Sequence, residues 1–172
     1  MRKIALVICE GETEVCYLNL LNKWYKSPIK IVSHIEGTKI TPSLVENRIK
    51  ELKISSRDKV YTFLMYDMDV EVVNEKLLKC KAEMLLSNPC FEIWLLLHIK
   101  DQKTAIKTDA LIKELKKIAP VWKNYNKSSF TDTQQSFLKD NTDVAVIRAK
   151  DLREFQNPST GIYKLIEMLK KR

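Results

Sequence analysis

Carboxylates follow two short apolar segments of this chain. Residues 4–9 are apolar and run into Glu10-Gly11-Glu12-Thr13-Glu14, and residues 60–66 run into Asp67-Met68-Asp69. β-rich apolar runs of this length fit buried strands. In open α/β sheets, ligands bind at the carboxyl ends of the strands. Two such ends lying side by side would form a carboxylate pocket suited to a hard cation such as Mg²⁺.

The first acidic group divides into two kinds of residue. Glu12 and Glu14 fall at the start of the expected helix 13–25, where the helix dipole favours negative charge. A role at the helix start explains these two residues well. Glu14 is also a candidate for a residue that holds the catalytic or metal-binding residues in place. Glu10 stands earlier, at the strand tip before Gly11, which is expected to let the backbone turn sharply. We therefore take Glu10 as a candidate catalytic and metal-binding residue.

Asp67 and Asp69 form the second group. Alternate residues of an extended segment point the same way, so both carboxylates can face one site while Met68 turns inward. Carboxylates held together repel one another unless a cation or a proton joins them. A simple turn after a strand would also use aspartate. The pairing with Glu10 favours Mg²⁺ or Mn²⁺ as the cofactor, bound by Glu10, Asp67 and Asp69.

The chain alternates strand and helix patterns in its first half, which predicts an α/β fold with a mainly parallel sheet of about four strands. The second half is helical. We expect an α/β core over 1–99 and a helical extension over 100–172 packed on it, as a single compact domain. The predicted elements are strands 3–9, 29–35, 59–66 and 82–86, helices 13–25, 41–52, 71–79, 90–99, 104–118 and 141–155, an irregular stretch 119–140 with a weak helical pattern near 132–139, and a last helix after 157–160.

Composition narrows the class of protein. The 172 residues carry 45% apolar and 30% charged side chains, and the longest apolar stretch is too short to cross a bilayer. No secretory signal pattern is present, so a cytosolic protein is expected. The cysteines and histidines do not complete a zinc spacing. The net charge of +8 fits a polyanionic nucleic acid held near a metal, although a solvated lysine-rich surface is the alternative.

Residues 87–98 contain polar residues in an apolar context. Ser87 or Asn88 is expected to cap a helix whose first turn holds Pro89, and Asn88 is also a candidate supporting residue of the site. Glu92 lies inside that helix, where a buried carboxylate requires a partner. It is either paired in a salt bridge or a cap, or it is a catalytic candidate that binds the metal or supports the site. His98, near the helix end, is either a packing residue or a supporting group of the site. Among basic residues, Lys123, Lys127 and Arg148 could each contact a phosphate or stabilise charge in the transition state, or simply be solvated. We take Lys127 as the catalytic candidate among them.

A strand ending in Glu-Gly followed by a strand ending in Asp-x-Asp resembles the Toprim domain of topoisomerases, primases and OLD-type nucleases. The resemblance implies a general acid/base role for Glu10 and Mg²⁺ ligation by Asp67 and Asp69. A primase- or topoisomerase-like activity has no support, because 172 residues leave no room for a second domain that handles template or strand passage.

A more specific resemblance is to the RloB-like family, a Toprim branch linked to restriction loci and abortive phage infection. It is carried by the block 87–98, by Glu10-Gly11-x-Thr13-Glu14-x-x-Tyr17, by Tyr125-x-Lys127 and by the late block 157–160. It implies a metal-dependent nuclease of phage defence, acting on DNA or RNA with a partner ABC- or AAA-type ATPase. The rival is a nucleic-acid-binding or regulatory subunit that is inactive alone. The oligomeric state, a homodimer included, stays open.

Overall fold

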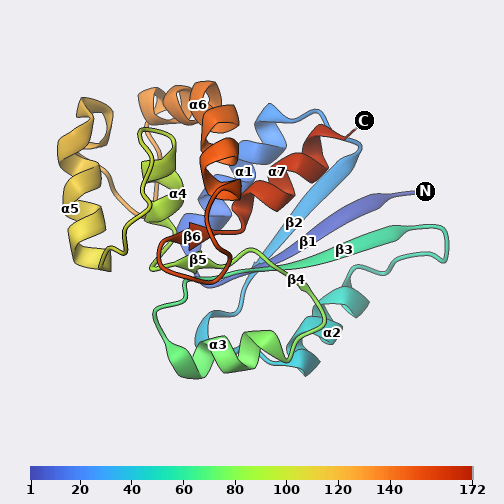
Figure 1. Ribbon diagram of the computed structural model, residues 1–172. Helices are drawn as coiled ribbons and strands as arrows, with labels where there is room; N and C mark the ends of the chain where they lie inside the picture. Colours follow the sequence, from blue (N-terminus) through green and yellow to red (C-terminus); the bar gives the residue numbers. More distant parts are fainter. Residues whose placement is uncertain (172) are drawn as a thin grey trace.

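A parallel four-stranded sheet forms the centre of the computed structural model, which describes residues 1–171 (Figure 1). The strand order is β2-β1-β3-β4, and every pairing in this sheet is parallel. The α/β class and the parallel sheet predicted from the sequence are therefore confirmed. The strands are β1 (Lys3–Cys9), β2 (Ile29–Ile35), β3 (Lys59–Met65) and β4 (Glu83–Met84).

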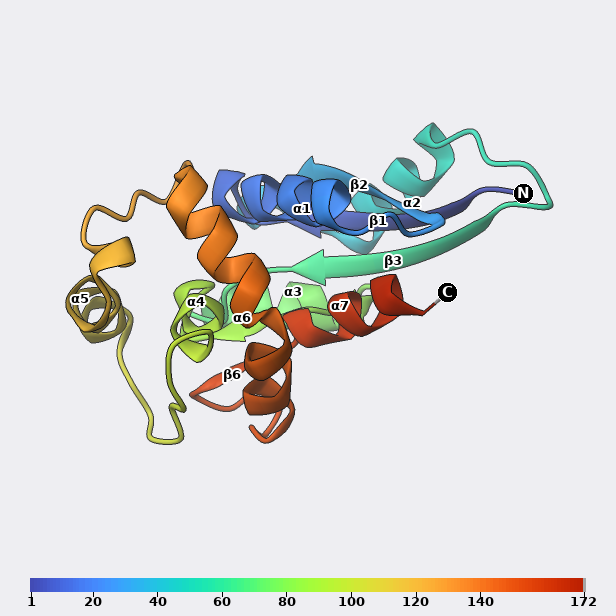
Figure 2. The same cartoon turned by 90° about the horizontal axis from the view of Figure 1, so that it is seen from above.

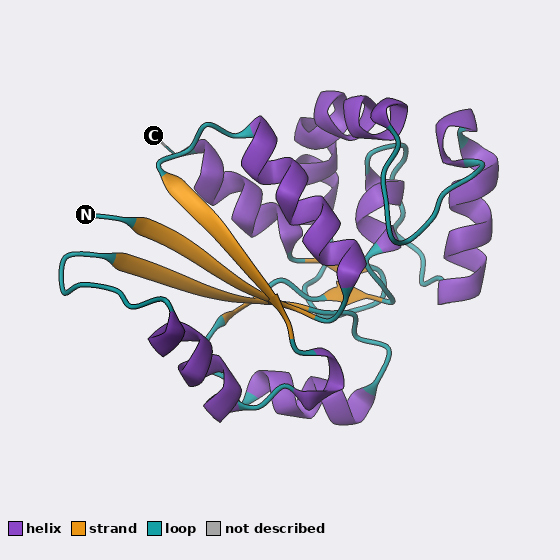
Figure 3. Cartoon of the chain, turned by 180° about the vertical axis from the view of Figure 1, so that it is seen from behind, coloured by secondary structure: helices purple, strands orange, loops and turns teal. Residues whose placement is uncertain are grey.

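Helices cover both faces of the sheet. The apolar residues of β1 therefore alternate between two buried cores, one on each face. Ala5, Val7 and Cys9 pack on the face covered by α1 and α7. Leu6 and Ile8 pack on the face covered by α2 and α3. Figure 3 shows this arrangement from behind, with the strands between the two layers of helices. The helices that touch the sheet are α1 (Glu12–Trp24), α2 (Pro42–Glu51), α3 (Glu71–Leu78) and α7 (Ile162–Lys170).

The second half adds a helical layer beyond the carboxyl ends of the strands (Figure 2). A two-stranded antiparallel ribbon of β5 and β6 joins it to the sheet. One continuous apolar cluster includes residues of β1, α4, α6 and α7, so the helical half shares its core with the sheet. The remaining elements are β5 (Ser87–Asn88), α4 (Glu92–Leu97), α5 (Thr108–Ile118), α6 (Asp132–Lys150), β6 (Ser159–Thr160), and the 3₁₀ turns η1 (Gly37–Lys39) and η2 (Pro120–Trp122).

Two local predictions are wrong. Residues 87–89 do not open a helix, because Ser87 and Asn88 pair with β6 and α4 begins only at Glu92. No separate helix covers 141–155, since α6 runs unbroken over Asp132–Lys150 and joins most of that segment to the weak helical pattern near 132–139. A capping box fixes its start: Thr131 Oγ1 accepts a hydrogen bond from Gln134 N, and Gln134 Oε1 accepts one from Thr131 N.

No helix within residues 1–171 combines the length and the apolar character required to span a bilayer.

Candidate active site

The carboxyl ends of β1 and β3 bring Glu10 and Asp67 together. The two strands are neighbours, with Cys9 opposite Met65. Just beyond this pair, the backbone N–H of Asp67 donates a 2.9 Å hydrogen bond to Glu10 Oε2. The structure therefore joins the two strand ends whose acidic residues pointed to a common site.

A second hydrogen bond fixes the Asp67 side chain. Its Oδ1 accepts a 2.7 Å bond from the backbone N–H of Phe91, which directly precedes α4. Asp67 also forms an isolated parallel bridge with Ser87, next to the antiparallel ribbon. The side chain is thus held between the sheet and the start of α4. Asp69 lies further out on an exposed part of the chain, yet its charge reaches Glu10.

Glu14 and Glu92 complete a cluster of four carboxylates. Glu14 is 5% exposed and accepts a 3.1 Å hydrogen bond from Gly11 N. Glu92 is 1% exposed, and its Oε1 accepts a 3.3 Å hydrogen bond from the Tyr125 hydroxyl. Its other oxygen, Oε2, is buried without a hydrogen-bond partner. A buried carboxylate oxygen with no partner is costly, so this oxygen is a candidate ligand for a cation.

Gly11 does not have the role expected from the sequence. Its φ of −155° and ψ of −166° are extended backbone that any residue adopts, so no sharp glycine turn is required. A Cβ at this position would meet only Glu14 Oε2, at an ordinary 3.7 Å. The glycine contributes its N–H to Glu14 instead.

Burial and mutual repulsion raise the pKa values of the clustered carboxyls. The pKa of Asp67 rises to about 8, first because of burial and then because of the charges of Glu10, Glu14 and Glu92. Burial, with a contribution from Glu10, raises the pKa of Glu14 to about 7. Burial also raises the pKa of Glu10; Asp69 adds to this effect, while the Asp67 N–H and Lys127 oppose it. The site therefore favours either protons or a cation over bare carboxylates.

Lys127 places a positive charge beside this cluster. Its Nζ lies 3.3 Å from Glu92 Oε1, while 57% of its side chain remains exposed. Burial lowers the pKa of Lys127, but the charge of Glu92 outweighs this and the net direction is upward. The ammonium is therefore charged at neutral pH, and it can contact both the cluster and a solvent-borne ligand.

The loop that carries Lys127 is tied to α1. Thr13 Oγ1 donates a 2.6 Å hydrogen bond to the Lys127 carbonyl, and Cys16 Sγ donates to the Ser128 carbonyl at 3.1 Å. These two bonds join residues more than 100 positions apart in the chain. The first turns of α1 thus supply Glu14, one carboxylate of the cluster. They also position the loop that carries the Lys127 ammonium.

The donor chemistry of the cluster fits a divalent cation. Carboxylate oxygens are the ligands that Mg²⁺ and Mn²⁺ prefer. The partnerless Glu92 Oε2 and the raised pKa values of Glu10 and Asp67 mark a place where positive charge is stabilised. As the side chains stand, no three His, Cys, Asp or Glu residues of the described part, 1–171, form a group that could hold one metal ion.

A scan against protein-family models matched residues 5–169 to the model described as "RloB-like protein". The chain belongs to the RloB-like family. The match covers nearly the whole chain, helical half included. Searches of curated proteins and of solved structures found no match.

Two other predicted residues of this RloB-like protein have partners outside the cluster. Asn88 Nδ2 donates a 3.0 Å hydrogen bond to the Phe155 carbonyl. His98 is buried at the opposite end of α4 from Glu92, with its Nδ1 2.8 Å from the Trp94 carbonyl. Burial lowers the pKa of His98 to about 4, so the ring is neutral at pH 7. In this structure, both side chains bond to backbone carbonyls outside the carboxylate cluster.

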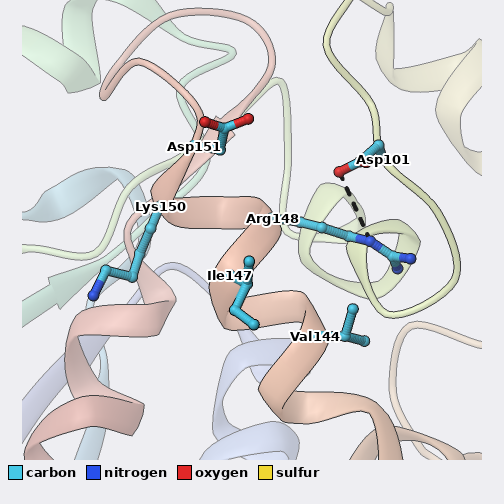
Figure 4. A pocket seen from close by; sticks show the side chains of 6 residues that line it. All are labelled: Asp101, Val144, Ile147, Arg148, Lys150 and Asp151. Carbon is cyan, nitrogen blue, oxygen red and sulfur yellow. Dashed lines mark ion pairs between the residues drawn. The ribbon is translucent and has the colours of Figure 1, made fainter.

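Arg148 and Lys123 differ in how they are held. Arg148 Nη1 donates a 2.7 Å hydrogen bond to the Leu97 carbonyl at the end of α4, and its Nε lies 3.7 Å from Asp101 (Figure 4). It lines a surface recess of about 540 Å³ on the outer side of α6, formed by Asp101, Val144, Ile147, Arg148, Lys150 and Asp151. Lys123 is exposed and forms no ion pair within residues 1–171.

Sequence reasoning missed Thr13 and Cys16 as the residues that position Lys127. Nothing in their local pattern predicts these bonds, because the acceptors lie in a distant loop. The sequence did contain a signal for the contact between the Tyr125 hydroxyl and Glu92. The spacing Tyr125-x-Lys127 lets alternate residues face one partner.

Proposed function

We propose that this RloB-like protein is a metal-dependent phosphodiesterase that cleaves nucleic acid. The observation that carries the proposal is the contact between Glu10 and Asp67 at the carboxyl edge of the sheet, with Lys127 beside the cluster that they form. Support comes also from the pattern of Glu-Gly and Asp-x-Asp at the ends of neighbouring parallel strands, which resembles Toprim nucleases.

Glu10, Asp67 and Asp69 would hold the cation, Mg²⁺ or Mn²⁺. The proposal requires that the ion draw these carboxylates together, and Glu92 Oε2 is a further oxygen of the cluster that could bind it. A divalent ion bound there would supply Lewis-acid polarisation of a phosphate and stabilise the charge that develops on it.

Side chains of the protein would orient the phosphate and transfer a proton during cleavage. The exposed part of Lys127 can contact a phosphate oxygen, while Glu92, itself bonded by the Tyr125 hydroxyl, holds the position of the ammonium. Glu10 is suited to general acid/base chemistry, because burial and the charge of Asp69 raise its pKa above the usual value of a glutamate.

The biological setting we propose is phage defence, with an ATPase as the partner. The RloB-like resemblance supports both, and the rival role is that of a subunit that binds nucleic acid but cleaves only in a complex. The two roles differ in one observation. Cleavage by the purified chain alone identifies an autonomous nuclease, whereas binding without cleavage until the ATPase is added identifies a conditional subunit.

The test of the proposed function is cleavage of labelled RNA and DNA with Mg²⁺ or Mn²⁺. We expect D67N/D69N to abolish cleavage, since it removes two of the proposed ligands and keeps side-chain size. The matched control is E46Q/D140N, which neutralises two exposed carboxylates that form no ion pair within residues 1–171. Equal cleavage by the wild type and by D67N/D69N would refute the assignment of the site.

A further inference from the structure

The positive charge of the molecule is concentrated in one segment. Residues 100–127 contain eight lysines and three acidic residues, which gives +5 of the total net charge of +8. Residues 1–99 contribute only +1, with fourteen basic and thirteen acidic side chains. Most of the excess, five of eight charges, therefore belongs to α5 and its flanking loops.

α5 turns its apolar side inward and its lysines outward. Leu111 is buried in a cluster with Cys90, Ile93 and Leu96 of the α4 region, and Leu115 is buried in the main core. Figures 1 and 2 show α5 as the outermost helix, at the end of the molecule away from both termini.

The α5 lysine face consists of Lys113, Lys116 and Lys117, with Lys107 and Lys123 on either side; all five are exposed. None of the five forms an ion pair among residues 1–171. The acidic neighbour Glu114 is already paired with Lys100. Lys113 and Lys117 also line a shallow recess of about 410 Å³ along the helix.

The dipole of α5 explains only part of this group of lysines. Lys116 and Lys117 lie in the last turn of α5, where the helix dipole favours cations. Lys107, Lys113 and Lys123 lie outside that turn, so the dipole does not account for them.

The α5 lysine face leads to the carboxylate cluster. From the end of α5 the chain passes through η2 (Pro120–Trp122) to Lys123 and then to Lys127, whose Nζ contacts Glu92. α5 also packs on α4, which begins at Glu92. The α5 lysine face and the carboxylate cluster are thus joined by a short, continuous run of structure.

We propose that the α5 lysine face binds the phosphodiester backbone of the nucleic acid and guides it to the carboxylate cluster. This rests on the proposed function for the identity of the ligand, but it assigns a separate, non-catalytic binding surface. α5 has 11 residues and is therefore about 16 Å long, the axial rise of about five base pairs of a duplex.

The test measures binding and not cleavage. Fluorescence anisotropy in EDTA would follow labelled single-stranded DNA, the same sequence as RNA, and duplex DNA, with K113Q/K116Q/K117Q compared with the wild type. Gln keeps the helix propensity of Lys. We expect affinity to fall at least about tenfold near 0.1 M salt, and the slope of log K against log salt to become shallower by about 2–3.

The control is K26Q/K30Q/K50Q, which removes the same charge from exposed lysines near the amino-terminal edge of the sheet. A similar loss in both variants, no loss in the α5 variant, or no binding of any probe by the wild type would overturn the inference. Because the readout needs no metal, the inference survives an absence of cleavage. Retained cleavage with unchanged binding in the α5 variant would refute this surface while leaving the proposed function intact.

Discussion

Replacing Asp67 by Asn should stabilise the metal-free protein and abolish its response to Mg²⁺. The partly buried carboxylate lies among the charges of Glu10, Glu14 and Glu92, and burial together with these charges raises its pKa to about 8. Asn is nearly the same size and keeps an oxygen that can accept the 2.7 Å hydrogen bond from Phe91 N. The substitution removes the charge and retains the contact.

The expected gain depends on pH with a definite sign. Between its usual pKa of 3.8 and about 8, Asp67 binds a proton more tightly in the folded than in the unfolded protein. The free energy of unfolding of the wild type therefore falls as pH rises through this interval. The gain from D67N should be small near pH 4 and largest near pH 8.

The magnitude follows from the size of the pKa change. A rise from 3.8 to about 8 would correspond to roughly 6 kcal/mol if nothing relaxed. Water and side-chain movement weaken such interactions several-fold at partly exposed sites, so we expect about 1–2 kcal/mol near pH 8. For a chain of this size, that difference raises Tm by about 2–8 °C.

Thermal unfolding in EDTA across this pH range would test the prediction, with the exposed substitution D140N as control. At pH 8, added Mg²⁺ should raise the Tm of the wild type and leave that of D67N unchanged. A D67N protein less stable than the wild type at pH 8, or a gain that does not vary with pH, would refute our account of repulsion in the cluster.

Three further predictions concern stability and are measured by urea unfolding. Lys127→Met leaves buried Glu92 without its cation and should cost about 2 kcal/mol, most of which Glu92→Gln should restore in the double variant; a double variant as unstable as K127M would contradict the pairing. Gly161→Ala puts a Cβ 2.9 Å from the Met84 carbonyl oxygen and should cost about 1–3 kcal/mol, whereas a neutral effect would show that the backbone yields. Thr131→Ala removes the cap of α6 and should cost about 1 kcal/mol; no loss would mean that the helix start needs no cap.

The sheet could be predicted because its signals are local. β1, β2 and β3 match the predicted strands to within one residue, since each is a short run rich in β-formers that ends at a polar group. The convergence of Glu10 and Asp67 followed from the rule that parallel strands end at one edge.

The helical half was harder because its interior is partly polar. α6 buries Gln134 and Thr142, which interrupt the apolar periodicity; their side chains donate to the Val121 and Leu138 carbonyls. In the sequence, buried polar residues whose hydrogen bonds are satisfied in this way cannot be told from surface residues. The strand at Ser87–Asn88 depends on pairing with a segment more than 70 residues later, which no local pattern reveals.

The sequence predicted that Glu10 and Asp67 would lie together, but it did not predict the contacts that hold the residues around them. Glu10 and Asp67 stand at strand ends, where position alone identifies them. The pairing of Glu92 with Lys127 depends on how the distant loop docks on α1, through Thr13. Contacts between a helix and a remote loop are set by tertiary packing, so they became visible only in three dimensions.

The most direct test of the central claim is a crystal structure of the wild-type protein with Mn²⁺, examined by anomalous diffraction. We predict a Mn²⁺ peak bound by oxygens of Glu10 and Asp67, at ligand distances of about 2.0–2.2 Å. A peak confined to other residues, or no peak at these carboxylates at saturating Mn²⁺, would contradict the assignment.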